Sequence, residues 1–365
     1  MTRTKTFGIG DIAIRPGTTR DLHLEVSQRY TGDPITLPMR IIRAKREGPT
    51  VFVSAAVHGD ELNGTGIVHD LMFGDPLPLV RGTVILIPVL NIFGFETQER
   101  YMPDRRDLNR CFPGSSSGSL TSRVANIVYR EIIQQSDYGI DLHTAAVQRT
   151  NYPNVRGDLT VPGIRRISRA FGCELILNSK GPDGSLRREA TKAGCPTIIL
   201  EAGEPFKIEP SMLDVGVRGV RNVLVDLDML EGKLTRPPYQ VRIDKSTWVR
   251  AEVGGILRFH VGPGAIVVEG EPIATNANVF GEEQNVLVSP TDGIILGMAT
   301  LPMVKPGEPV CHIAVPTKPL SSIRKARKGA SRDSLHHRMR KDLATNVSVS
   351  EHEGERAPDT VNDEG

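Results

Sequence analysis

The chain has 365 residues, with 45 Lys and Arg against 43 Asp and Glu, so its formal net charge is only +2. This balance argues against a protein that mainly coats nucleic acid or an anionic membrane, and no apolar run is long enough to span a bilayer. The first residues lack the apolar core of a signal peptide, and the four cysteines form no CxxC pair. These features predict a cytoplasmic globular enzyme with reduced thiols.

The first two thirds of the chain alternates apolar runs with segments of helical character. Runs of small and β-branched residues predict strands at 49–57, 82–89, 138–142 and 196–200. Between and after them, apolar spacing predicts helices at 62–73, 119–135, 163–171 and 212–230. Strands without polar alternation, separated by helices, favour an α/β fold with a mostly parallel sheet flanked by helices. We expect this domain to cover residues 1–240.

Residues 241–316 differ from the first two thirds of the chain, because they consist of short β-rich segments separated by glycine turns. The sequence Gly-Glu-Pro-Ile at 270–273 returns as Gly-Glu-Pro-Val at 307–310. This near-repeat predicts a small all-β barrel or sandwich domain, which we expect to cap or wall an active site.

Residues 317–365 separate their charges into a basic block followed by an acidic block, with few apolar residues. That composition predicts a disordered, charged tail. A solvated tail is a simpler interpretation than a contact with RNA or lipid, so nucleic acid is an unlikely partner.

Four side chains that suit catalysis follow the ends of three predicted strands. His58 and Glu61 come after the first strand, His143 follows the third, and Glu201 follows the fourth. In open α/β sheets, ligands bind beyond the carboxyl ends of the strands, so these side chains are expected to converge.

Two imidazoles and one carboxylate form a typical catalytic zinc shell that leaves a position open. His58 and Glu61 are three residues apart on a strand-to-helix turn, with Gly59 between them, and His143 completes the set. A single His-x-x-Glu is common by chance, but the strand-end context favours a site for one Zn²⁺ per chain. Asp141 is expected to orient the ring of His143.

Glu201 is predicted to act as general base on a water molecule and to return the proton to a leaving amine. Glu204, three residues further on, is the competing carboxylate. The long loop 91–114 carries four arginines, and guanidinium groups bind carboxylates, so an acidic substrate is indicated if some of them point inward.

Together these segments resemble the succinylglutamate desuccinylase/aspartoacylase family, a branch of the zinc carboxypeptidase-like fold. The segments that carry the resemblance are His-Gly-Asp-Glu at 58–61, Arg100 with Asp-Leu-Asn-Arg-Cys-Phe-Pro-Gly at 107–114, Asp-Leu-His at 141–143 and Leu-Glu-Ala-Gly at 200–203.

The resemblance implies a role for each matching residue. His58, Glu61 and His143 would bind zinc, and Glu201 would activate the water. Arg100 would polarise the scissile carbonyl, although Arg105 or Arg106 could take its place. The substrate-binding candidates are Asn109, Arg110 and, more weakly, Arg156.

The predicted activity is therefore zinc-dependent hydrolysis of the amide bond of a small N-acylated amino acid or related amine. The alternatives are a metallocarboxypeptidase acting on short peptides and a non-catalytic binding protein. A small-molecule acyl-amine is the expected partner, a membrane is not, and homo-oligomerisation is left open.

Overall fold

The computed structural model describes residues 7–329, 331 and 334–344. The strands of its N-terminal part are β1 (Gly8–Ile9), β2 (Ile12–Ala13), β3 (Thr18–Gln28), β4 (Pro34–Arg43), β5 (Thr50–Ala55), β6 (Thr83–Ile87), β7 (Tyr138–His143), β8 (Arg149–Gly157), β9 (Leu175–Asn178) and β10 (Thr197–Gly203). The helices of this part are α1 (Leu62–Phe73), α2 (Ile92–Thr97), η1 (Leu108–Arg110), α3 (Leu120–Glu131), η2 (Ile133–Gln135), α4 (Pro162–Phe171), α5 (Leu186–Lys192) and α6 (Pro210–Asp226). The C-terminal part consists of β11 (Val241–Arg250), β12 (Gly255–Phe259), β13 (Ile266–Val267), β14 (Pro272–Ala277), β15 (Glu283–Val288), β16 (Gly293–Ala299), β17 (Met303–Val304), β18 (Pro309–Pro316), α7 (Leu320–Lys328) and α8 (Leu335–Ala344).

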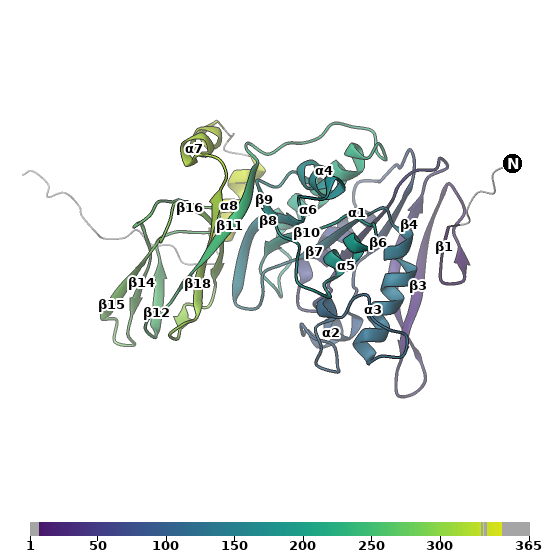
Figure 1. Ribbon diagram of the computed structural model, residues 1–365, viewed down its shortest axis with the longest axis horizontal. Helices are drawn as coiled ribbons and strands as arrows, with labels where there is room; N and C mark the ends of the chain where they lie inside the picture. The colour runs from purple at the N-terminus through teal and green to yellow at the C-terminus, as the bar shows by residue number, and fades with distance from the viewer. Residues whose placement is uncertain (1–6, 330, 332–333, 345–365) are drawn as a thin grey trace, which may run out of the picture.

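One large sheet connects most of the molecule. Its twelve strands follow the order β13-β16-β18-β11-β9-β8-β10-β7-β5-β6-β4-β3. Figure 1 shows β3 and β4 toward one end of the elongated molecule and the β-rich C-terminal strands toward the other. Because β11 pairs with β9, the sheet passes without a break across residue 240. The division into domains at that residue remains a prediction.

Helices cover both faces of the central strands, which confirms the predicted α/β class. Along β5, Val51 and Val53 belong to a buried cluster that includes Ile67 of α1 and side chains of α4 and α6. Phe52 points the other way, into a cluster that includes Val124 of α3 and side chains of α5. Both faces of the strand are therefore buried, which explains why its apolar residues do not alternate with charged ones.

The expectation of a mostly parallel sheet is wrong, because the sheet is mixed. Strand β5 runs parallel to β6 and β7, and β7 runs parallel to β10. By contrast, β3, β4 and β6 pair antiparallel, and β8 lies antiparallel to β10. Only residues 144–148 separate β7 from β8, which is too short for the crossover that a parallel return needs. Strands β3 and β4 were not predicted, and their more buried residues alternate with more exposed ones.

The expectation of a disordered tail from residue 317 is wrong for α7 and α8. The few apolar residues of this region lie where a helix can bury them. Met339 and Leu343 of α8 are spaced by four positions and are both buried, together with His336. Residues 345–365, which hold the predicted acidic block, lie outside the described residues.

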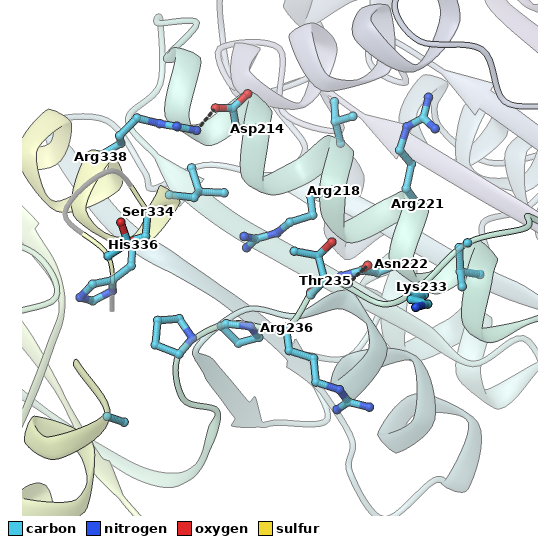
Figure 2. Close-up of a pocket in the computed structure, with 18 of the residues that line it drawn as sticks. Asp214, Arg218, Arg221, Asn222, Lys233, Thr235, Arg236, Ser334, His336 and Arg338 are labelled. Carbon is cyan, nitrogen blue, oxygen red and sulfur yellow. Dashed lines mark hydrogen bonds and ion pairs between the residues drawn. The ribbon is translucent and has the colours of Figure 1, made fainter. Parts of the chain in front are cut away.

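A buried ion pair attaches α8 to the body of the protein. His336 Nδ1 lies 2.6 Å from Glu174 Oε1, and the Tyr152 hydroxyl donates to Glu174 Oε2 over 2.6 Å. Burial raises the pKa of the Glu174 carboxyl, but the hydrogen bond and charge of His336 outweigh burial and hold that pKa below its usual value. At the exposed edge of α8, Arg338 pairs with Asp214 of α6 at 2.8 Å, as Figure 2 shows.

No helix in the part of the chain that the structure describes combines the length and apolar character that a membrane crossing requires.

His336→Ala tests whether α8 is an integral part of the fold. The substitution removes the imidazole that compensates the buried charge of Glu174 and leaves only neutral donors such as Tyr152, so we expect the free energy of unfolding in urea to fall by about 3–5 kcal/mol. The control is Arg338→Ala, which breaks the exposed pair with Asp214 and should cost about 1 kcal/mol or less. Equal losses for the two variants would contradict this account of the helix.

Candidate metal centre and active-site cavity

The carboxyl ends of three neighbouring parallel strands meet at one edge of the sheet. His58 and Glu61 lie in the turn that follows β5, and His143 is the last residue of β7. Glu201 of β10 pairs in register with His143. The strand order β10-β7-β5 therefore brings together the four side chains that the sequence placed at strand ends.

The turn after β5 packs directly against the backbone of α2. A Cβ atom at Gly59 would lie 2.0 Å from the carbonyl carbon of Gly94, so only glycine fits there. The Gly59 amide donates to the carbonyl of Glu99 over 3.0 Å. These contacts fix the turn that orients His58 and Glu61.

Glu61 lies between the two imidazoles. Its Oε1 is 2.7 Å from His58 Nδ1, and its Oε2 is 2.9 Å from His143 Nδ1. One ligand atom from each of the three residues falls within 4.8 Å of the others, and all three residues are buried. The backbone amide of Thr144 donates to Glu61 Oε2 over 3.1 Å.

The outward nitrogen of each imidazole faces a second carboxylate. His143 Nε2 lies 2.8 Å from Asp141 Oδ2, as expected, and Asp141 also accepts a hydrogen bond from Ser54. His58 Nε2 lies 3.2 Å from Asp107 Oδ1. Asp107 opens the Asp-Leu-Asn-Arg segment, but no role was predicted for it. Both rings are thereby held with Nδ1 directed inward.

The charges of this cluster shift one another's pKa values. Burial raises the pKa of Glu61, but the charges and hydrogen bonds of the two histidines outweigh it, and the pKa lies well below its usual value. Burial lowers the pKa of His143, but the charges of Asp141 and Glu61 raise it well above its usual value. The pKa of His58 is raised in the same way, with Glu61 and Asp107 outweighing burial.

This donor set fits a zinc ion. Two imidazole nitrogens and a carboxylate oxygen face one buried point, and that combination suits zinc with a coordination position left for substrate. A carboxylate on the far side of each ring is the usual support for metal-binding histidines.

The cluster forms one wall of a cavity of about 400 Å³. The cavity is also lined by Arg100, Asn109, Arg110, Arg149, Asn151, Arg156, Arg187, Glu201, Trp248 and His312. Trp248 and His312 come from β11 and β18, and their rings stack 4.2 Å apart. Burial, followed by the charge of Arg156, lowers the pKa of His312 to about 4, so this wall is uncharged at neutral pH.

Among the three candidate arginines of the loop, Arg100 is the one that reaches the cavity. Its Nη2 donates to Asp107 Oδ2 over 3.0 Å, and its Nη1 lies 3.5 Å from Glu61 Oε1. Arg105 and Arg106 are exposed and do not line the cavity.

Asn109 and Arg110 line the cavity as well, but part of each side chain has a structural contact. Asn109 Oδ1 accepts the backbone amide of Leu186 over 2.8 Å. Arg110 Nη1 donates to the Asn109 carbonyl over 2.7 Å.

Of the two candidate carboxylates, Glu201 faces the cavity. Its Oε2 accepts a hydrogen bond from Asn151 over 3.0 Å, and Arg156 Nη1 lies 3.6 Å from its Oε1. Glu204 instead pairs with Lys207 at 2.5 Å and accepts from Thr300 over 2.7 Å.

Arg187 is a cavity residue that the sequence analysis missed. It is only 6% exposed, and its Nη1 has no hydrogen-bond partner within the described structure. Burial, followed by the charge of Arg156, lowers its pKa to about 10, so the guanidinium still carries its charge. No motif marked it, because it lies on α5 outside every strand end. A buried, unpaired guanidinium beside a cavity indicates an anionic ligand group.

Comparison with known proteins agrees with this architecture. Residues 47–227 match the family model described as the succinylglutamate desuccinylase/aspartoacylase catalytic domain. A curated relative, the N-alpha-acetyl-L-2,4-diaminobutyric acid deacetylase of Halomonas elongata, is 27% identical over 252 residues, which span 66% of this chain and 73% of that protein.

Two solved structures share the fold. The succinylglutamate desuccinylase/aspartoacylase from Rhodobacter sphaeroides superposes with a TM-score of 0.74 at 23% identity, covering 85% of this chain and 99% of that one. The ectoine utilization protein EutE (DoeB) from Ruegeria pomeroyi gives a TM-score of 0.74 at 21% identity, covering 86% and 100%.

The affinity of the metal-free protein for Zn²⁺ should rise with pH. The pKa values of His58 and His143 are raised by the surrounding carboxylates, so both rings hold a proton more tightly than a free imidazole, and any such proton must leave before a metal binds. We expect about a tenfold gain per pH unit for each proton displaced. Competition with a chromophoric chelator between pH 6 and 8 measures it, and an affinity that is flat across this range would contradict the assignment.

Proposed function

Because the chain belongs to the succinylglutamate desuccinylase/aspartoacylase family, we propose that it is a zinc-dependent deacylase that hydrolyses the amide bond of a small N-acylated amino acid or related amine. The observation that carries the proposal is the convergence of His58, Glu61 and His143 on one point of a cavity that also contains Glu201. In this proposal the three converging residues hold the metal.

The metal ligands, Glu201 and Arg100 each have a task in this reaction. A zinc ion held by the three ligands would supply Lewis acidity toward the acyl carbonyl and make water easier to deprotonate. Glu201 removes a proton from the attacking water and delivers it to the leaving nitrogen. Arg100 donates hydrogen bonds to the carbonyl oxygen as negative charge develops on it. The water oxygen forms the new bond to the acyl carbon and the C–N bond breaks. The second proton of the water also passes to the nitrogen, so the products leave as a carboxylate and a protonated amine.

A neighbouring carboxylate holds the charged guanidinium of Arg100 in position for this task. Asp107 lies between Arg100 and His58 and contacts both, so one carboxylate orients an arginine and an imidazole together. Burial raises the pKa of Asp107, but the hydrogen bond and charge of His58 outweigh it and lower that pKa, so Asp107 stays ionised.

The lining of the cavity supports a small, acidic substrate. Five arginines line it, namely Arg100, Arg110, Arg149, Arg156 and Arg187. Arg187 has an unpaired nitrogen and is the best-placed partner for a substrate carboxylate. The volume of about 400 Å³ and the wall of Trp248 and His312 favour an acylated amino acid over a peptide. The curated relative is named for the deacetylation of such a compound.

Two substitutions separate metal binding from proton transfer. His143→Ala should lose both bound zinc and turnover. Glu201→Gln should keep the zinc but lose about 10²- to 10⁴-fold in kcat, because the amide cannot accept the proton. Metal analysis and hydrolysis of an N-acetyl amino acid measure both effects. Full turnover by Glu201→Gln with normal zinc content would remove Glu201 from the mechanism.

Arg187→Gln tests the nature of the substrate. On a panel of N-acetyl, N-succinyl and N-formyl amino acids, we expect KM to rise about 10- to 100-fold, as for the loss of a hydrogen bond to a charged group. Arg188→Gln is the matched control, because the next arginine pairs with Asp183 at 2.8 Å and does not line the cavity. Equal effects of the two variants, or better turnover of short peptides than of the panel, would contradict the proposed substrate class.

A further inference from the structure

The carboxylate of Glu201 is held by two side chains of one neighbouring strand. Asn151 Nδ2 donates to Oε2 over 3.0 Å, and Arg156 Nη1 lies 3.6 Å from Oε1. Both residues belong to β8, which pairs antiparallel with β10 and changes register between Glu201 and Gly203. At 3.6 Å the arginine supplies charge but no well-formed hydrogen bond, so the orientation of the carboxylate depends on Asn151.

The position of Asn151 depends in turn on a strand from the C-terminal part of the chain. Strand β16 pairs antiparallel with β8 and sets Gly297 opposite Asn151. A Cβ atom at position 297 would lie 2.6 Å from Asn151 Oδ1 and 3.1 Å from the Thr150 carbonyl. The amide of Asn151 therefore occupies the space that any side chain at 297 would need.

We propose that Asn151 is a positioning residue for Glu201, and that Gly297 fixes the orientation of Asn151. This inference rests on the proposed function, in which Glu201 moves the proton. In this inference the C-terminal part of the chain contributes to the site in two ways. Its strand β16 pairs with β8 and so positions Glu201 through Asn151, and its residues Trp248 and His312 form a wall of the cavity.

Glu201 needs a positioning residue because a glutamate carboxylate rotates freely about its terminal bond. The terminal torsion of a glutamate is broad, so an unsupported carboxylate samples many planes. A neutral donor on one oxygen fixes the plane and leaves the other oxygen for the proton. Proton transfer requires hydrogen-bond geometry, and a displacement of about 1 Å can lower the rate by about 10².

The test compares the zinc-loaded full-length protein with Asn151→Ala and Gly297→Ala. The first variant removes the donor. The second substitutes no cavity residue but pushes the Asn151 amide aside. We expect kcat to fall about 10- to 100-fold in Asn151→Ala and about tenfold in Gly297→Ala, with KM and zinc content unchanged. Met298→Leu is the control, because its side chain packs in the C-terminal core and a swap of similar volume is tolerated.

Combination with Glu201→Gln separates this inference from the proposed function. In that background neither substitution should lower kcat further, because the group that they orient no longer transfers a proton. If Glu201→Gln loses turnover while Asn151→Ala and Gly297→Ala keep the wild-type kcat, the positioning role is wrong and the proposed function stands. A rise in KM alone would also overturn it, since it would make Asn151 a substrate contact. If Asn151→Ala does not fold, Gly297→Ala with its control decides the matter.

Discussion

The buried carboxylate of Glu61, held between the Nδ1 atoms of His58 and His143, is the interaction on which the rest of the site depends. A charge can be buried this deeply only when it is paired and hydrogen-bonded. Here the pairing is extended outward, since each imidazole has a second carboxylate behind it. The result is a continuous chain of carboxylates and imidazoles from Asp107 to Asp141 that directs three ligand atoms to one point.

The sheet supplies the scaffold for this arrangement. Parallel pairing of β5, β7 and β10 brings their carboxyl ends to one edge, where backbone hydrogen bonds fix the relative heights of the side chains. The C-terminal part then closes the cavity from the side. It contributes Trp248 and His312 to the wall and Gly297 behind Asn151. His336 anchors α8 to Glu174. Glu174 also accepts a hydrogen bond from Tyr152, which lies on β8, the strand that carries Asn151.

Local signals in the sequence predicted the part of the site that lies at strand ends. Apolar runs locate the strands, and the polar residues that follow them are His58, Glu61, His143 and Glu201, which the strand order β10-β7-β5 brings together as expected. The helix predicted at 62–73 has the same bounds in the structure.

What could not be predicted depends on tertiary contacts. Arg187 becomes a cavity residue only because α5 packs beside β10, and Asn151 only because β8 enters between β10 and β9. The mixed sheet was missed because apolar runs do not encode strand direction. Helix α8 was missed because its composition is polar overall. Three of its residues are spaced so that they lie on one face, and that face is buried.

The most direct test of the central claim is a crystal structure of the zinc-loaded protein with anomalous diffraction data collected on both sides of the zinc absorption edge. The account predicts one strong anomalous peak per chain, bounded by His58 Nδ1, His143 Nδ1 and the carboxylate of Glu61, beside the cavity that contains Glu201. An active, zinc-loaded protein with no anomalous peak at that point would contradict it.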